Sequence, residues 1–221
     1  MIIERRRYSI VRDQMDRMHG RMTEMLLPMF KEHGIPSPIA IWEDRDGGSI
    51  LTWMIEWPSF DARQALWANF YPHFYAAHGK ETGEEFVTRT DLTLVAPWSD
   101  RAFAFADAEA ACECAWHPQP LIGFGAAFRE AMSGPEADIF RSVGTIAVNV
   151  CGIVFGPLPM AMVILSWPDS DTRREGMALL SGLRAPAAIG ASLGLDEGAL
   201  TDVGLWESFD RMRYLSTWRL A

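Results

Sequence analysis

The chain has 221 residues, of which 49% are apolar and 22% charged, a composition typical of a globular protein that excludes an intrinsically disordered chain. The net charge of −9 opposes binding to nucleic acid and to anionic membrane surfaces, so we expect neither as a partner. Twelve methionines and nine tryptophans favour a deep apolar interior or pocket.

The first 97 residues contain a regular succession of expected strands and helices. We expect strands over residues 2–10, 38–44, 49–57 and 90–97, and helices over residues 14–33 and from Ser59 or Asp61 to about residue 78. Met15, Met18 and Met22 begin an apolar stripe in the first helix, and Gly34 ends that helix. Residues 46–48, Asp-Gly-Gly, predict a hairpin turn. The order β-α-β-β-α-β is the ferredoxin-like pattern.

A repeated motif divides the chain into two similar halves. WPSFDAR begins at Trp57 and WPDSDTR at Trp167, so the motif Trp-Pro-x-x-Asp-x-Arg recurs after 110 residues (167 − 57). Each copy follows an apolar run and precedes a helical pattern. We therefore predict two tandem ferredoxin-like units, residues 1–98 and a degenerate copy over residues 99–221.

The second half repeats the pattern less clearly. After a connector over residues 100–111, we expect strands at 111–117, 145–154, 160–167 and 214–220, and helices at 121–132 and 171–184. Residues 142–168 contain no charged side chain, a length that could span a bilayer. The sequence Gly-Pro-Leu-Pro at 156–159 instead predicts a turn between two buried strands.

The predicted fold class is α+β. A ferredoxin-like sheet has helices on one face, and its other face must be covered. Two such units can place sheet against sheet, so we expect the tandem chain to form an α+β barrel within itself. A homodimer is a further possibility that the sequence leaves open.

Cysteine usage indicates the compartment. Cys112, Cys114 and Cys151 are odd in number, and no signal peptide precedes Ile2, so we expect a reducing cytoplasm. The Cys-x-Cys pair has no second cysteine or histidine pair at metal-finger spacing, and we therefore expect no metal site.

The first half contains several motifs that occur together in one known family. They are Glu4, Arg6 and Tyr8 in the first strand, Leu26-Leu27-Pro28 and His33-Gly34-Ile35 at the end of the first helix, and Trp42 and Trp57 in the next two strands. In these motifs the first half resembles the NIPSNAP family of the dimeric α+β barrel superfamily. The resemblance covers residues 2–97 well and the second half only through the Trp-Pro motif.

The resemblance implies a barrel with cavities, but it does not imply one reaction. Proteins with this fold include cofactor-free monooxygenases, isomerases, cyclases, haem enzymes and proteins without known catalysis. A histidine common in the family, two residues before the tryptophan of the third strand, is Ile55 here and Leu165 in the second copy. No role tied to that histidine is therefore carried over.

Three polar side chains of the first strand are candidates for the site. Glu4, Arg6 and Tyr8 alternate, so they share one face of the strand. In one interpretation, Glu4 and Arg6 form an ion pair at the seam between the two sheets and fix how the halves dock. In the other, Arg6 binds a carboxylate or enolate and Tyr8 donates a hydrogen bond to it.

The expected helix after residue 59 contains the other candidates. His73 falls in line with Leu66, Phe70 and Ala77, which we interpret as the inward stripe, and Tyr71 lies on the adjacent stripe. His73 could move a proton near neutral pH, although a histidine on an apolar face is often a core residue. The second copy of this helix, DTRREGMALLSGLR, has no histidine or aromatic residue, which favours a pocket in the first half.

Further residues complete the predicted site. Glu56, at the end of the third strand, is a candidate general base if it is buried, and a solvated carboxylate otherwise. The apolar residues expected to contact a substrate are Trp42, Trp53, Trp67, Phe70 and Phe74. We expect His33 to cap the first helix and His19 to be exposed to solvent.

These residues predict an enzyme that acts on an apolar, aromatic small molecule by cofactor-free acid–base chemistry. His73 would move a proton, and Tyr71, Tyr8 or Arg6 would stabilise the resulting oxyanion. A lyase, an isomerase or cyclase, and a monooxygenase are all compatible with this chemistry. The alternatives are a non-catalytic binding or scaffold protein of the NIPSNAP type and a haem-dependent barrel enzyme.

Overall fold

The protein is described by a computed structural model of the whole chain. It describes residues 1–44, 49–79, 85–98, 108, 110–118, 130, 138–155, 161–183, 200–202 and 207–211. The chain divides into two compact units, unit 1 (Met1–Leu94 with Arg211–Ala221) and unit 2 (Val95–Asp210), and each is described by itself. The boundary after residue 98 inferred from the sequence stays a prediction.

Unit 1 contains the predicted ferredoxin-like arrangement. Its strands are β1 (Ile2–Ile10), β2 (Ala40–Asp44), β3 (Ile50–Trp57) and β4 (Val87–Pro97), whose last residues run on into unit 2. Their order is β4-β1-β3-β2. Strands β1 and β3 are antiparallel along their whole length, from Ile2 opposite Trp57 to Ser9 opposite Ile50. The expected order of strands and helices is therefore confirmed in this unit.

The first helical segment contains an irregular turn. It consists of α1 (Met15–Gly20), the π-helical segment η1 (Arg21–Leu26) and α2 (Leu27–Glu32), where a single helix over residues 14–33 was predicted. Gly34 ends it with a φ of 70°, in the left-handed region that glycine adopts without strain. The amide of Ile35 donates to the carbonyl of Phe30 at 2.8 Å, which closes a Schellman-type end.

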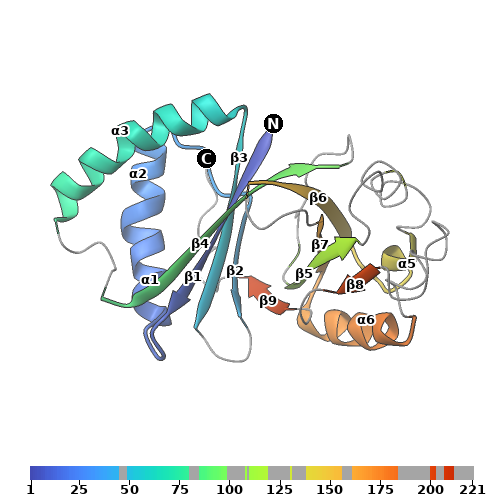
Figure 1. Cartoon of the computed structure of the whole chain (residues 1–221). Helices are drawn as coiled ribbons and strands as arrows, with labels where there is room; N and C mark the ends of the chain where they lie inside the picture. The colour runs from blue at the N-terminus through green and yellow to red at the C-terminus, as the bar shows by residue number, and fades with distance from the viewer. Residues whose placement is uncertain are drawn as a thin grey trace. The chain divides into compact units, whose positions relative to one another are not determined.

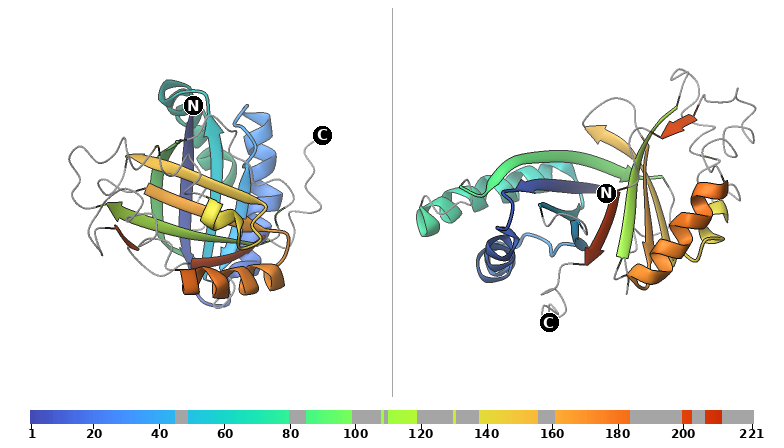
Figure 2. Two further views of the ribbon diagram at one scale, coloured as in Figure 1. Left: turned by 90° about the vertical axis from the view of Figure 1, so that its right-hand side faces the viewer. Right: turned by 90° about the horizontal axis from the view of Figure 1, so that it is seen from below.

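The second helix, α3 (Phe60–His78), begins between the two predicted first residues, Ser59 and Asp61. The Ser59 hydroxyl accepts a hydrogen bond from the Ala62 amide at 3.1 Å and caps the helix, and Gly79 follows its last residue. Both helical segments pack on the same face of the unit 1 sheet, as Figure 1 and Figure 2 show. Trp67, Phe70 and Phe74 are the buried side chains of α3.

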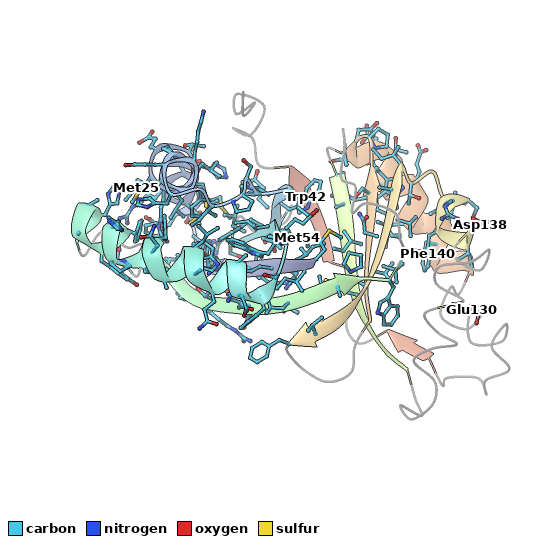
Figure 3. All side chains as sticks on the ribbon, turned by 90° about the horizontal axis from the view of Figure 1, so that it is seen from above. Met25, Trp42, Met54, Glu130, Asp138 and Phe140 are labelled. Atoms are coloured by element: carbon cyan, nitrogen blue, oxygen red, sulfur yellow. The ribbon has the colours of Figure 1, made fainter. Side chains whose placement is uncertain are left out.

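Alternation along β3 separates two chemically different faces. Trp53, Ile55 and Trp57 belong to the hydrophobic core beneath the helices. Thr52, Met54 and Glu56 therefore lie on the opposite face of the sheet. Trp42 of β2 pairs with Thr52 and belongs to that second face together with Met54 (Figure 3).

Unit 2 repeats this strand order. The strands β5 (Ala110–Pro118) and β6 (Ala147–Phe155) flank β7 (Ala161–Trp167), and β8 (Leu200–Asp202) and β9 (Glu207–Arg211) both pair with β5. The helix α6 (Ser170–Leu183) lies along one face of β5 and β7 (Figure 2). The structure therefore supports the second ferredoxin-like unit that the Trp-Pro motif predicts.

Some expectations lie outside the described residues, and three elements of unit 2 were not expected. The predicted turn at 46–48 in unit 1, the helix at 121–132 apart from Glu130, and the strand at 214–220 are not described. The unexpected elements are the four-residue helix α5 (Asp138–Arg141) and the strands β8 and β9. All three are too short to produce a clear periodic apolar pattern. None of the described helices is long and apolar enough to cross a lipid bilayer.

Two helical glycines provide a matched test of packing. A Cβ atom at Gly176 of α6 would lie 2.5 Å from the Val143 carbonyl oxygen and 2.6 Å from the Trp167 Nε1 atom, whereas one at Gly20 would meet nothing within 4 Å. We expect Gly176→Ala to lower the free energy of unfolding by about 1–3 kcal/mol because the helix must move away. Gly20→Ala should instead raise it by up to about 1 kcal/mol through helix propensity. Denaturant titration of both variants measures the difference, and equal stabilities would contradict the close approach of α6.

Candidate functional site

The carboxylate of Glu4 is the centre of a buried hydrogen-bond network. Glu4 is 0% exposed to solvent. Its Oε2 atom accepts hydrogen bonds from Trp57 Nε1 at 3.0 Å, Trp67 Nε1 at 2.8 Å and Arg63 Nε at 2.7 Å. Its Oε1 atom accepts from Arg6 Nε at 2.5 Å and Arg63 Nη2 at 3.2 Å. Five donated hydrogen bonds hold this carboxylate between β1, β3 and α3.

These donors keep Glu4 ionised despite its burial. Burial alone would raise the pKa of Glu4, because it removes water from the charged form. The charge of Arg6 and the hydrogen bonds from Arg63, Trp67 and Arg6 outweigh burial and hold the pKa of Glu4 below its ordinary value. A carboxylate of this kind is a poor general base, so its role in the site is to position the arginines.

Arg6 is fixed between Glu4 and a tyrosine of α3. Its Nη1 atom donates a hydrogen bond to the Tyr71 hydroxyl oxygen at 2.9 Å. Its guanidinium carbon lies 4.3 Å from the ring centroid of Trp67 and 5.2 Å from that of Trp53, so both rings contribute cation–π attraction. Burial opposes its charge, but the nearby oxygens of Tyr8, Glu4 and Tyr71 raise the pKa of Arg6 above its ordinary value. The site therefore contains a permanent, oriented positive charge.

Tyr71 remains protonated beside this charge. Burial raises the pKa of the Tyr71 hydroxyl, although the charge of Arg6 and its hydrogen bond act in the opposite direction. The hydroxyl oxygen already accepts a hydrogen bond from Arg6, so its own proton can be donated to another oxygen. The ring stacks on Trp67 with the centroids 5.4 Å apart, which holds the phenol in place.

The predicted aromatic residues of α3 and β3 form a packed layer beside the arginine. Trp53, Trp67, Phe70 and Phe74 are all core residues of unit 1, at most 5% exposed. Trp67 and Phe70 meet edge to face with their centroids 5.4 Å apart, and Phe70 stacks on Phe74 at 5.5 Å. Tyr8 joins the layer through an edge contact of 6.1 Å with Trp53. The structure thus brings these residues together, and their predicted contact with a substrate stays a prediction.

The inward orientation expected for His73 is wrong. His73 is exposed, its Nδ1 atom lies 2.7 Å from the Asn69 carbonyl oxygen, and its ring lies 4.9 Å from that of His33. Tyr71 and His73 are two residues apart on a helix, about 200° around its axis, so only Tyr71 reaches Arg6. The buried stripe is Trp67, Phe70 and Phe74 rather than the stripe through residue 73. A catalytic role for His73 stays a prediction.

Glu56 and Trp42 are separated from the Arg6–Tyr71 pair by the sheet. Both lie on the face of unit 1 that points away from the helices, because they alternate with the core residues of β3 and β2. Glu56 is half-buried, and Trp42 is buried. The predicted site residues therefore divide between two faces, and the structure does not bring these two together with Arg6.

Two other sequence-based expectations need correction. Glu4 and Arg6 were interpreted as a possible seam between sheets, but among the described residues the hydrogen-bond partners of their side chains come from β1, β3 and α3 of unit 1. His19 was expected to be exposed, but it is 1% exposed and its Nε2 atom lies 2.6 Å from the Glu43 Oε2 atom. The partners of Glu4 on β3 and α3, and the partner Glu43 of His19, were missed because they are distant in the sequence.

Sequence reasoning also missed two arginines. Arg63 is the last residue of the first Trp-Pro-x-x-Asp-x-Arg motif, and the recurrence of the motif was the signal that could have identified it as a network member. Arg21 reaches from η1 toward α3, with its guanidinium carbon 5.8 Å from the Phe74 ring. No pattern in the sequence marks Arg21.

Register shows which residues replace this network in unit 2. Glu4 pairs with Ile55 and Arg6 with Trp53, while Cys112 pairs with Leu165 and Cys114 with Val163. Leu165 and Val163 of β7 lie 110 residues after Ile55 and Trp53 of β3, which is the offset of the repeat. Cys112 and Cys114 therefore occupy the positions equivalent to Glu4 and Arg6. The ionic pair is therefore a property of unit 1.

Comparison with solved structures confirms the α+β fold. A candidate monooxygenase from Fusobacterium nucleatum subsp. nucleatum superposes with a TM-score of 0.58 at 12% identity, over 95% of this chain and 90% of that one. An anthrone oxidase-like protein gives 0.59 at 9% identity, over 96% and 91%. A candidate chlorite dismutase gives 0.54 at 10% identity, over 96% and 95%. At these identities the likeness shows the fold and nothing further.

The comparisons assign no family. A NIPSNAP domain protein from Burkholderia xenovorans is among the similar structures, with 14% identity over 48% of this chain and all of that one, but at a TM-score of 0.33 it carries no argument. No protein-family model and no curated protein match the sequence. What the likeness shows is the fold, and the resemblance to NIPSNAP remains one of sequence motifs.

The buried network predicts a pH-dependent loss of stability. Glu4→Gln leaves Arg6 and Arg63 without their counter-ion, and we expect it to lower the free energy of unfolding by about 3–5 kcal/mol at pH 7. The folded-state pKa of Glu4 is below its unfolded value. Its contribution is therefore complete above about pH 4.3 and is lost as the pH falls through the folded-state pKa.

Urea titration of the wild type and Glu4→Gln between pH 3 and pH 8 measures this effect. The difference in stability should shrink on acidification, since the protonated wild type then resembles the variant. Glu56→Gln removes a half-buried carboxylate from the opposite face and serves as the control. A difference between wild type and Glu4→Gln that stays constant with pH would contradict the ionised state of Glu4.

Proposed function

We propose that this protein is an enzyme that acts on an apolar, aromatic small molecule and stabilises negative charge on one of its oxygen atoms, without a cofactor. The observation that carries the proposal is the hydrogen bond between Arg6 and the Tyr71 hydroxyl within the aromatic layer of unit 1. Structural packing alone would not require an arginine and a tyrosine hydroxyl to meet beneath a helix.

Arg6 supplies the charge that such a reaction needs. An oxyanion is stabilised most by donors that are already oriented in a water-poor site, because they need not reorganise during the reaction. Glu4 and the rings of Trp67 and Trp53 hold the Arg6 guanidinium in one orientation. Its positive charge would lower the pKa of a bound phenol or enol, so that the substrate ionises near neutral pH.

Tyr71 supplies the second interaction. Its raised pKa keeps the hydroxyl protonated, and the hydrogen bond from Arg6 leaves its proton available for the substrate oxygen. An oxyanion would thus receive one charge-assisted hydrogen bond from Tyr71 while Arg6 lies behind it. Glu4 would stay ionised throughout and keep Arg6 in place.

Several reactions can follow from the stabilised anion. It can expel a leaving group in a lyase, accept a proton at another carbon in an isomerase, attack an electrophilic carbon of the same molecule in a cyclase, or give an electron to dioxygen in a monooxygenase. We favour the monooxygenase because two chains of the same fold are named as a candidate monooxygenase and an anthrone oxidase-like protein. That preference rests on analogy of fold.

A non-catalytic binding or scaffold role is the second candidate. It is favoured by the close packing of Trp53, Trp67, Phe70 and Phe74, which are core residues whether or not a ligand binds. In that case the Arg6–Tyr71 pair would only fasten α3 to β1. The two functions differ in what they predict for a bound phenol.

Tyr71→Phe separates these functions. We expect the wild type to bind 4-nitrophenol with an apparent pKa below that of the free phenol, and to bind its neutral analogue 4-nitroanisole more weakly at pH 7. Tyr71→Phe should weaken binding of the phenolate by roughly 10- to 100-fold, the loss expected for one hydrogen bond to a charged group. Absorbance titration across pH measures both quantities, and oxygen uptake with 1-naphthol tests turnover.

The control variant is Tyr75→Phe, which removes the hydroxyl of the tyrosine one helical turn after Tyr71. Tyr75 is 51% exposed and stacks on Tyr71. Tyr75→Phe should leave phenolate binding unchanged. An unshifted pKa of the phenol in the presence of the wild-type protein would reject the oxyanion site and favour the scaffold role, and a Soret band in the purified protein would reject the cofactor-free chemistry.

A further inference from the structure

Arg21 is a second cation beside the same aromatic layer. It is the first residue of the π-helical segment η1, a local irregularity that is frequent at functional sites. Its side chain is half-buried, so part of it stays in contact with solvent. Its guanidinium carbon lies 5.8 Å from the ring centroid of Phe74, a core residue of α3.

Two buried donors, one in the layer and one beside it, lack acceptors among the described residues. The Nε atom of Arg21 is buried and has no hydrogen-bond partner among the described residues. The Nε1 atom of Trp53, which is 0% exposed, is in the same condition. More than nine in ten buried polar groups in proteins are paired, and an exception calls for a missing water, ion or ligand. Both groups are donors only, so any group that pairs with them must be an acceptor.

The groups around Arg21 also favour an anion. The titratable side chains that act on it are Tyr8, Glu85, Tyr75 and Tyr71, and burial, the largest influence, lowers the pKa of Arg21. Glu85 is the acid among them, and it is already paired with Arg17 at 2.6 Å. Tyr8 and Tyr71 also act on Arg6, so the charges of both guanidinium groups are influenced by the same two phenols.

We propose that Arg21 binds the carboxylate of an aromatic acid whose phenol or enol oxygen lies at Arg6 and Tyr71. The substrate class is then a small aromatic carboxylic acid with a second acidic oxygen on the ring. An anion at Arg21 would accept a hydrogen bond from its Nε atom. It would also supply a counter-charge of its own for this half-buried cation, whose nearby acid Glu85 is already paired with Arg17. The proposal deepens the proposed function and rests on it for the position of the second oxygen.

Matched probes test the carboxylate separately from the phenol. The probes are 1-naphthoate, its neutral isostere 1-naphthamide, and 1-naphthol, each titrated calorimetrically into the full chain at pH 7. We expect the wild type to bind 1-naphthoate at least about 10-fold more tightly than 1-naphthamide. Arg21→Gln should abolish this preference, a change of roughly 10- to 100-fold, and should leave the pKa shift of bound 1-naphthol in place.

Control variants keep the test independent of charge and folding. Lys31→Gln removes one positive charge from an exposed side chain of α2 in the same helical segment, and it should retain the preference for 1-naphthoate. Arg21→Lys keeps the charge but loses the Nε donor, and it should retain only part of the preference. Circular dichroism of each variant establishes that it is folded.

The outcomes separate the two proposals. Equal affinity of the wild type for 1-naphthoate and 1-naphthamide, or an unchanged preference in Arg21→Gln, overturns the role of Arg21. If 1-naphthol still binds with a lowered pKa in that case, the proposed function at Arg6 and Tyr71 stands. If the preference for 1-naphthoate depends on Arg21 while the 1-naphthol pKa is not shifted, the anion site stands and the oxyanion chemistry at Arg6 fails.

Discussion

The buried carboxylate of Glu4 is the constraint on which unit 1 depends. An ionised group removed from water is tolerated only when hydrogen bonds and opposite charges replace its hydration. Here two arginines and two tryptophans do so, from β1, β3 and α3. The same requirement determines where α3 must lie, because Arg63 and Trp67 are one turn apart on the face that meets Glu4. The position of Tyr71, one further turn along, and hence its contact with Arg6, follows from that docking.

Charge and aromatic packing in this layer depend on each other. The rings of Trp67 and Trp53 exclude water from Arg6, and this exclusion strengthens both its ion pair with Glu4 and its hydrogen bond with Tyr71. At the equivalent positions of unit 2, register places Cys112 and Cys114, so the duplicated fold does not require the ion pair. Its presence in one unit only is the asymmetry that supports the site proposed for unit 1.

The order of elements in unit 1 could be predicted from the sequence because apolar residues recur there with the periods of strands and helices. Residues that cap or end helices, such as Ser59 and Gly34, also mark the boundaries. It did not recover the orientation of α3. Five of the nine residues from Trp67 to Tyr75 are aromatic, and they fall on two stripes about 100° apart that fit the helical period equally well. The rotation is fixed by contacts with the distant strand β1, in which Trp67 and Arg63 donate to Glu4 and Tyr71 accepts from Arg6. His19 was misplaced for the same reason, because its partner Glu43 is on a distant strand.

The five hydrogen bonds of Glu4 also have a consequence for the order of folding. Their donors come from residues 2 to 63 positions away along the chain, so β1, β3 and α3 must all be in place before the carboxylate is satisfied. A partly assembled sheet that buried Glu4 without α3 would hold a charge with too few partners and would be unstable. We therefore expect unit 1 to fold in one cooperative step, in which docking of α3 and burial of β1 occur together, rather than through a compact intermediate that lacks the helix.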